Sequence, residues 1–130
     1  MNGMNLMEEI AKHLEWCGFG TAADEETDGN IHWGRMPDSP DDCICVYSTD
    51  SGVGGPDSTA RLQIMNRAKS TRTAYEVSEE IAQELDEFNG FLCGDGRMAI
   101  ISVINAATGL GPDTKKREVY VTNITVKYCG

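Results

Sequence analysis

The alternation of two rows of side chains over residues 118–128 is the feature that most restricts what this chain can fold into. Successive side chains of a strand point to opposite faces of a sheet, so a period of two predicts one long final strand. One row of the alternation holds Val119, Val121, Asn123 and Thr125, and the other holds Tyr120, Thr122, Ile124, Val126 and Tyr128. The chain is therefore expected to build a sheet that includes this strand.

Four other segments have strand character. Residues 31–34 are a short candidate, and residues 43–47 are almost wholly apolar, which predicts a strand buried on both faces. Residues 60–66 alternate, which predicts one solvent face, and residues 98–104 are expected to form a strongly buried strand. The segment NAATGLGPDTKKRE that follows is expected to be a loop.

Two segments have the period of an amphipathic helix. The first is residues 4–16, which Gly18 and Gly20 end. The second runs from a cap at Ser70 to about Phe88, where the sequence Asn89-Gly90 stops it. Its apolar stripe consists of Ala74, Ser78, Ile81, Ala82, Leu85 and Phe88.

The resulting order is α-β-β-β-α-β-β. Because strands and helices do not alternate strictly, we expect the α+β class, with a mostly antiparallel sheet flanked by two main helices. The 130 residues fit one domain, residues 1–130. No apolar run approaches the roughly 20 residues that a membrane span needs, and the start of the chain is acidic where a signal peptide is basic, so a cytosolic origin is expected.

Charge is distributed unevenly along the chain. Residues 1–57 contain 12 acids and 2 bases, a net charge of −10, whereas residues 58–130 contain 9 of each. Such an acidic half argues against wrapping nucleic acid, because phosphate contacts need lysine and arginine. It suits a surface that repels DNA or meets a basic partner, although simple solubility is the plain alternative.

The sequence lacks the residues of a catalytic site. The only imidazole bases are His13 and His32, and no nucleophile motif such as GxSxG is present. The five cysteines include no CxxC pair, so buried reduced thiols are favoured over the weak zinc candidates His13 with Cys17 and Cys43 with Cys45. No enzyme activity, metal or cofactor is therefore expected.

The stretch GRMPDSPDDCICVY, residues 34–47, looks like a motif. Its two prolines and its aspartates are turn formers, so it predicts a turn that leads into a strand, with the aspartates satisfying backbone N–H groups. A calcium site at Asp38, Asp41 and Asp42 is the weaker alternative, because calcium needs more oxygen ligands.

Two loops are candidates for partner contacts. Residues 48–58, STDSGVGGPDS, form a glycine-rich loop without the ending of a phosphate loop. Lys115, Lys116 and Arg117 form one compact basic cluster at an expected loop tip, which is either solvated or in contact with an acidic neighbour or DNA. Separate acidic and basic surfaces allow identical chains to pair head to tail and close into rings.

Several segments together resemble the bacteriophage minor capsid or tail-terminator family. They are MNLMEEIAKHLEWCGFGT, IHWGRMPDSPDDCICVYST, the glycine-proline loop and AYEVSEEIAQEL, followed by a last strand near the C-terminus. The most specific piece is Gly34-Arg35 with Pro37-Asp38 and Pro40-Asp41. In this resemblance Met4 is the expected start, so residues 1–3 are an overhang.

The resemblance implies a structural virion protein of a tailed phage or prophage, located in the tail or neck after assembly in the host cytoplasm. Such proteins form a ring, commonly a hexamer, that ends the tail tube and joins it to the head-completion protein without an enzyme activity, a cofactor or a membrane. DNA then passes the lumen without specific binding, and part of the acidic surface formed by residues 1–57 is expected to line it. The candidates for subunit contacts are Arg35, Asp50, Asp57, Lys115, Lys116 and Arg117.

Two other functions stay open at this point. One is a different neck or head-completion protein, and the other is a small acidic protein that binds a basic host partner.

Overall fold

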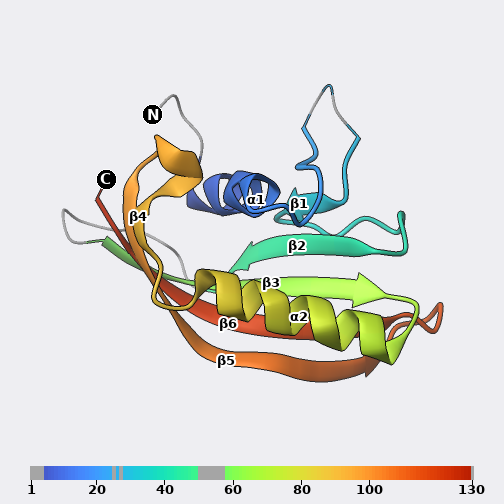
Figure 1. The fold of residues 1–130 in the computed structure, drawn as a ribbon. Coiled ribbons are helices and arrows are strands. Elements are labelled where there is room, and N and C mark those ends of the chain that lie inside the picture. Colours follow the sequence, from blue (N-terminus) through green and yellow to red (C-terminus); the bar gives the residue numbers. More distant parts are fainter. Residues whose placement is uncertain (1–4, 25, 27, 50–57, 130) are drawn as a thin grey trace.

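The computed structural model describes residues 5–24, 26, 28–49 and 58–129. Two α-helices, one short 3-10 helix and six strands follow one another along the chain (Figure 1). Their order is α1 (Leu6–Trp16), β1 (Ile31–Trp33), β2 (Cys43–Ser48), β3 (Ser58–Ala68), α2 (Thr71–Leu85), β4 (Asn89–Phe91), η1 (Leu92–Gly94), β5 (Met98–Pro112) and β6 (Glu118–Tyr128).

All six strands belong to one sheet, in the order β1-β2-β3-β6-β5-β4. β1 pairs with β2 in parallel, and the other neighbours are antiparallel. The sheet is mixed and curls into a half-barrel. Strands β3 and β6, which pair over their full 11 residues, form its centre.

The predicted fold class is wrong. Strands account for 43% of the described residues and helices for 25%, so the domain is mostly β, with a mixed sheet and the order α-β-β-β-α-β-β-β. The strand missing from the prediction is β4, which has only three residues and no period to reveal it. The parallel pair follows from the connection between β1 and β2, because residues 34–42 carry the chain back to the start of β2.

The long strand β5 corrects two further expectations. Residues 98–104 are not buried throughout, because inward residues such as Ala99 and Ile101 alternate with exposed ones such as Met98 and Ile100. The expected loop after residue 104 is instead the second half of β5, which reaches Pro112 through three register irregularities. A strand interrupted by bulges loses its period of two, so the sequence pattern ended too early.

Both predicted helices are confirmed, with caps that explain where they begin. The Asn5 side chain accepts a hydrogen bond from the Glu8 backbone N–H at 2.8 Å, and the Ser70 hydroxyl accepts one from Thr73 N–H at 3.1 Å. α2 ends at Leu85, earlier than expected, because Glu87 adopts a φ of 63° that a helix cannot contain.

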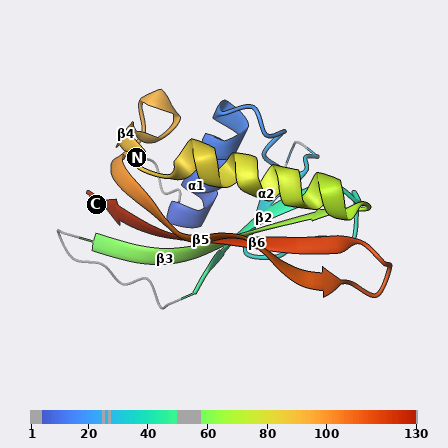
Figure 2. The same ribbon diagram turned by 60° about the horizontal axis from the view of Figure 1, so that its bottom comes forward.

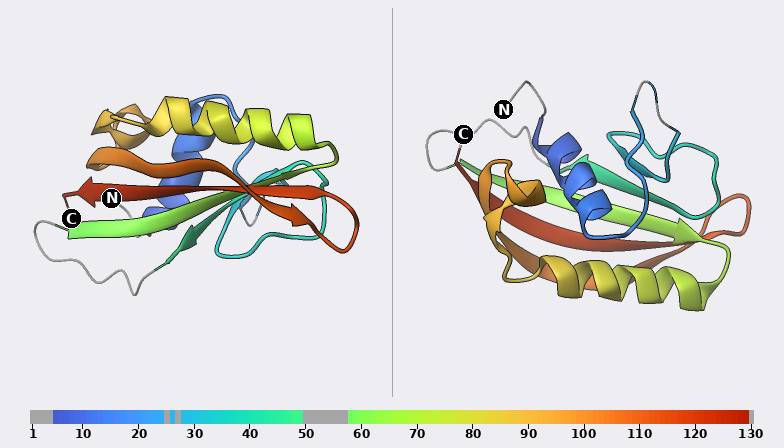
Figure 3. Two further views of the ribbon diagram at one scale, coloured as in Figure 1. Left: turned by 90° about the horizontal axis from the view of Figure 1, so that it is seen from below. Right: turned by 45° about the horizontal axis from the view of Figure 1, so that its top comes forward.

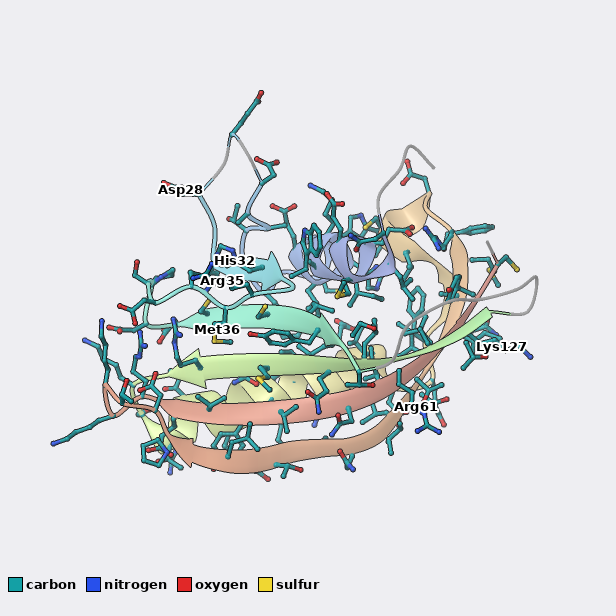
Figure 4. All side chains as sticks on the ribbon, turned by 180° about the vertical axis from the view of Figure 1, so that it is seen from behind. Asp28, His32, Arg35, Met36, Arg61 and Lys127 are labelled. Carbon is teal, nitrogen blue, oxygen red and sulfur yellow. The ribbon has the colours of Figure 1, made fainter. Side chains whose placement is uncertain are left out.

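The two helices cover the same face of the sheet (Figure 2). α1 packs against β1, β2 and η1, whereas α2 lies across β3, β6 and β5 (Figure 3). One shared core results, in which Ile10 and Leu14 of α1 and Ile81 and Leu85 of α2 are fully buried. In the described part of the chain no helix covers the opposite face, which is the one turned to the viewer in Figure 4.

Candidate functional site

The side chain of Arg117 joins two loops that are far apart in the sequence. Its guanidinium, of which only 5% is exposed, donates to Asp113 Oδ2 from Nε at 2.9 Å and to Asp38 Oδ1 from Nη2 at 3.1 Å. Its Nη1 lies 3.3 Å from Asp41 Oδ1. These contacts fix the loop between β5 and β6 to the loop between β1 and β2, and we call Arg117 with Asp38, Asp41 and Asp113 the Arg117 clamp.

Other cations hold the same loop. Arg67 and Lys69 do so from the end of β3, and Lys115 does so from the loop between β5 and β6. Arg67 donates to the carbonyl oxygens of Pro40 at 2.7 Å and Asp41 at 3.1 Å. Lys69 Nζ lies 3.3 Å from Asp41 Oδ2, and Lys115 pairs with Asp38. The PDSPDD motif is thus a docking loop, and Asp38 and Asp41 are ligands for cations of this chain more than partners for backbone N–H groups.

The pKa values of the clamp agree with this geometry. The Lys115 hydrogen bond is the main reason that the pKa of Asp38 is lowered, and Lys69 has the same effect on the pKa of Asp41. The pKa of Asp113 is lowered chiefly because its carboxylate accepts the backbone N–H of Arg117. All three carboxylates are therefore held in the charged form.

The residues predicted for subunit contacts lie in different environments. Lys115, Lys116 and Arg35 are exposed, whereas Arg117 is buried in its clamp instead of lying in a solvated tip. Lys116 stands at the end of the hairpin with a φ of 63°. The predicted contacts at Asp50 and Asp57 lie outside the described residues.

Acidic residues gather on the solvent side of α2. Residues 71–87 contain six acids and one base, which gives a net charge of −5. The acids are Glu76, Glu79, Glu80, Glu84, Asp86 and Glu87, and we call this exposed face the α2 acidic surface. The sequence pattern placed these glutamates off the apolar stripe. The net charge of residues 58–130 is nevertheless zero, because bases elsewhere in that half cancel the charge of the glutamates, so the net charge gave no sign of an acidic surface on α2.

Neither histidine lies in a catalytic arrangement. His13 is 1% exposed, accepts the backbone N–H of Cys93 at Nδ1 over 2.8 Å and stacks on Trp16. His32 Nε2 lies 2.9 Å from the carbonyl oxygen of Gly29. Burial raises the pKa of both the Cys17 and the Cys45 thiol to about 11, so these thiols stay protonated at neutral pH.

In the described part of the chain, no group of three or more His, Cys, Asp or Glu side chains is placed to hold a metal ion. Among the same residues, no helix has the length and apolar character that a membrane span requires.

The buried His13 ring leads to a pH prediction. Burial, opposed by the weaker effect of Glu84, lowers the pKa of His13. The neutral ring is thus favoured in the folded state, so its contribution is present above the ordinary value of 6.5 and is lost as the pH falls through the lower folded pKa. The free energy of unfolding, measured by urea denaturation, is expected to drop between about pH 7 and about pH 5.

The His13→Gln variant is the control for this prediction, since glutamine keeps an acceptor but does not titrate in this range. Its loss of stability over the same interval should be smaller than that of the wild-type chain. Equal losses in the two proteins would assign the pH dependence to other groups.

The comparison with protein families gave one match. The family model described as bacteriophage tail terminator protein matches residues 21–129. No curated protein and no solved structure matches the chain. The matched residues include the docking loop, α2, the full sheet and the Arg117 clamp.

Proposed function

Because the chain belongs to the bacteriophage tail terminator family, whose members are structural tail proteins, we propose that it forms a ring that ends the tail tube and provides the surface joining tail to head. Its partners are then other copies of itself, the tail tube protein and the head-completion protein. In the assembled tail the copies form a hexamer. The protein acts in the virion after assembly in the host cytoplasm, and its role requires no catalysis or cofactor.

The observation that carries the ring is the separation of charge between surfaces. The α2 acidic surface has a net charge of −5, whereas the exposed hairpin tip presents Lys115 and Lys116. Two acidic surfaces repel each other, so copies of the chain associate more favourably by placing unlike surfaces together. Such head-to-tail contacts close into a ring when the rotation between neighbours allows it.

The assignment of residues to subunit contacts remains a proposal, and the pairing of charges within the subunit changes which of these residues can make such contacts. Lys116 and Arg35 are exposed and available to acids of a neighbouring copy, with Asp50 and Asp57 as the partners that the sequence suggested, whereas Lys115 is exposed but already paired with Asp38. Arg117 belongs to this surface by position, but its charge is already paired within the subunit. Reversing Arg117 would therefore disturb the fold as well as any contact.

The lumen also remains a proposal. Glu9 is paired with Arg97, and Asp38 and Asp41 are paired with Lys115, Lys69 and Arg117, so these acids of residues 1–57 are neutralised within the subunit. Asp28 lies in a loop that extends away from the sheet (Figure 4). We propose that such unpaired acids face the passing DNA, and a map of the tail end with the acids on its outer rim would refute this.

A phage genome with this gene disrupted tests the function. We expect unjoined heads and tails in electron micrographs, with tube ends that lack a terminal ring, and full rescue by the wild-type gene supplied in trans. Rescue by an Arg35→Glu, Lys116→Glu double variant should be weaker, since exposed ion pairs contribute about 1 kcal/mol each and act together in a ring. Joined particles without the gene would contradict the proposal, and normal ringed tails beside unjoined heads would favour another neck protein.

A further inference from the structure

Exposed apolar side chains are concentrated at one edge of the sheet. Eight large apolar side chains are exposed among the described residues, and four of them lie on β4 and the first half of β5. They are Phe91 (57% exposed), Met98 (36%), Ile100 (45%) and Ile104 (55%), which we call the apolar strip. Grouped exposure of this kind marks an interaction surface, whereas scattered residues do not.

The strand register places the strip on the face that carries no helix. Phe91 and Met98 are direct cross-strand partners, and Ile100 follows on the same face as Met98. Ala99 and Ile101 point the other way and belong to the core under the helices. Ile104 lies at the first register irregularity of β5, between Val103 and Asn105, and extends the strip by its exposure of 55%.

Another part of the same face already has a cover. The segment of residues 34–42, which contains the docking loop, lies over β2 and β3, where Met36 N–H donates to Tyr47 Oη at 3.0 Å and Arg67 donates to the carbonyl oxygen of Pro40 at 2.7 Å. This cover belongs to the end of the sheet opposite β4 and β5. Among the residues that the structure describes, none closes over the apolar strip, whose four side chains are between 36% and 57% exposed.

Charge determines what kind of surface fits the strip. β4 and β5 contain no charged residue, and the exposed Lys127 of β6 is the cross-strand partner of Ile100. Two strips placed face to face would put two Lys127 side chains into one interface to which β4 and β5 bring no acid, which disfavours a symmetric contact. A surface with acids around an apolar group is complementary instead.

This chain carries such a surface on α2. Tyr75 is 42% exposed and lines a shallow hollow together with Glu76, Glu79 and Glu80. The helix of 15 residues is about 22 Å long, and the strip from residue 98 to residue 104 spans about 20 Å, so their lengths agree. A helix on an open sheet face is also the usual way to complete such a layer.

We propose that α2 of a second copy covers the apolar strip of the first, with Tyr75 against the strip and the glutamates toward Lys127. This inference rests on the proposed ring and names its subunit interface. The strip and α2 lie on opposite faces of the sheet, so each subunit offers one surface to each neighbour and the contact is head to tail. Layers of sheet and helix then alternate around the ring.

Sedimentation velocity of the full chain, in a concentration series up to the solubility limit, tests the strip. Ile104→Asp should weaken self-association at least about tenfold. Leu110→Asp is the matched control, because Leu110 is on the same strand and equally exposed at 55% but lies beyond the strip, and it should stay within about twofold of wild type. Thermal unfolding verifies that both variants fold.

A charge exchange tests the identity of the cover. Lys127→Glu alone should weaken association, and adding Glu76→Lys and Glu80→Lys to the same chain should restore it. An oligomer larger than a dimer that is weakened by Ile104→Asp and rescued by the exchange supports the proposal.

The opposite results separate this interface from the proposed function. A wild-type chain that stays monomeric or stops at a dimer overturns the contact, as does an oligomer that Ile104→Asp leaves intact or that the exchange fails to rescue. The gene disruption above tests the tail role independently, so the ring at the tail end can stand while this interface fails.

Discussion

Replacing Arg117 with methionine is expected to lower the midpoint of thermal unfolding by roughly 10 °C at neutral pH. Methionine fills a similar volume, but it leaves Asp38, Asp41 and Asp113 close together without the cation that they share. The Arg117 side chain is buried whereas Asp38 and Asp41 are largely exposed, so the cost arises from the repulsion between the carboxylates and from the lost hydrogen bonds that join the two loops. The docking loop and the hairpin should both loosen, which hydrogen exchange of residues 38–42 and 113–117 would report.

The pH dependence of this effect separates charge from packing. The pKa of each clamp aspartate is lowered in the fold, so the stabilisation is present above the ordinary value of 3.8 and is lost as the pH falls through the folded pKa. The difference between the midpoints of thermal unfolding of the wild type and Arg117→Met should therefore become smaller as the pH falls below 3.8. Lys116→Met, a change at the exposed neighbour, should leave the midpoint almost unaltered, and a gap that does not depend on pH would argue against the clamp.

Replacing Glu9 with alanine is expected to lower the free energy of unfolding by about 3 kcal/mol. Glu9 is 1% exposed, its Oε1 lies 2.6 Å from Arg97 Nε, and its Oε2 accepts the Arg97 backbone N–H at 3.2 Å. Arg97 also lies over the Tyr128 ring, 5.3 Å from its centroid. Loss of the carboxylate leaves a largely buried guanidinium without its counter-charge and frees residues 92–97 from α1.

Glu8 is the matched control for this change, since it is the adjacent acid in the first turn of α1 and is only half-buried. Glu8→Ala should lower the free energy of unfolding by about 0.5 kcal/mol, through the helix dipole alone. Urea denaturation of the two variants at neutral pH measures the difference. Equal effects would mean that the Glu9–Arg97 pair contributes little beyond its charge at the helix start.

Periodicity in the sequence predicted the elements whose two sides differ along their full length. The stripe of α2 and the alternation of β6 are both confirmed, because α2 buries one row of side chains and leaves the others accessible, and in β6 Thr122, Ile124 and Val126 are buried while Asn123, Thr125 and Lys127 are not. The apolar run of β2 was also correctly interpreted, since Ile44 and Val46 face the helices while Cys43 and Cys45 are buried on the other face. β4 and the second half of β5 were missed, because three residues and a bulged strand carry no period.

The Arg117 clamp could not be predicted from local sequence patterns. The aspartates of the docking loop were correctly assigned to a turn, but a turn alone gives no indication of which side chains the carboxylates meet. Asp38 and Arg117 are separated by 79 positions, and Arg67 reaches the same loop from β3. The basic triplet was expected to be either solvated or in contact with an acidic neighbour or DNA, and the burial of its last member depends on the loop between β1 and β2, which is distant in the sequence.

The sequence by itself determined the helices, the central strands, the overall acidity and the membership in the tail terminator family, because each of these depends on residue type and spacing within continuous segments. Only the tertiary structure decided which charges are neutralised within the subunit and which apolar side chains stay open. Both depend on the register of β4, β5 and β6 and on the path of residues 34–42 across the sheet. Contacts between distant segments depend on how the sheet curls, and no local period encodes that.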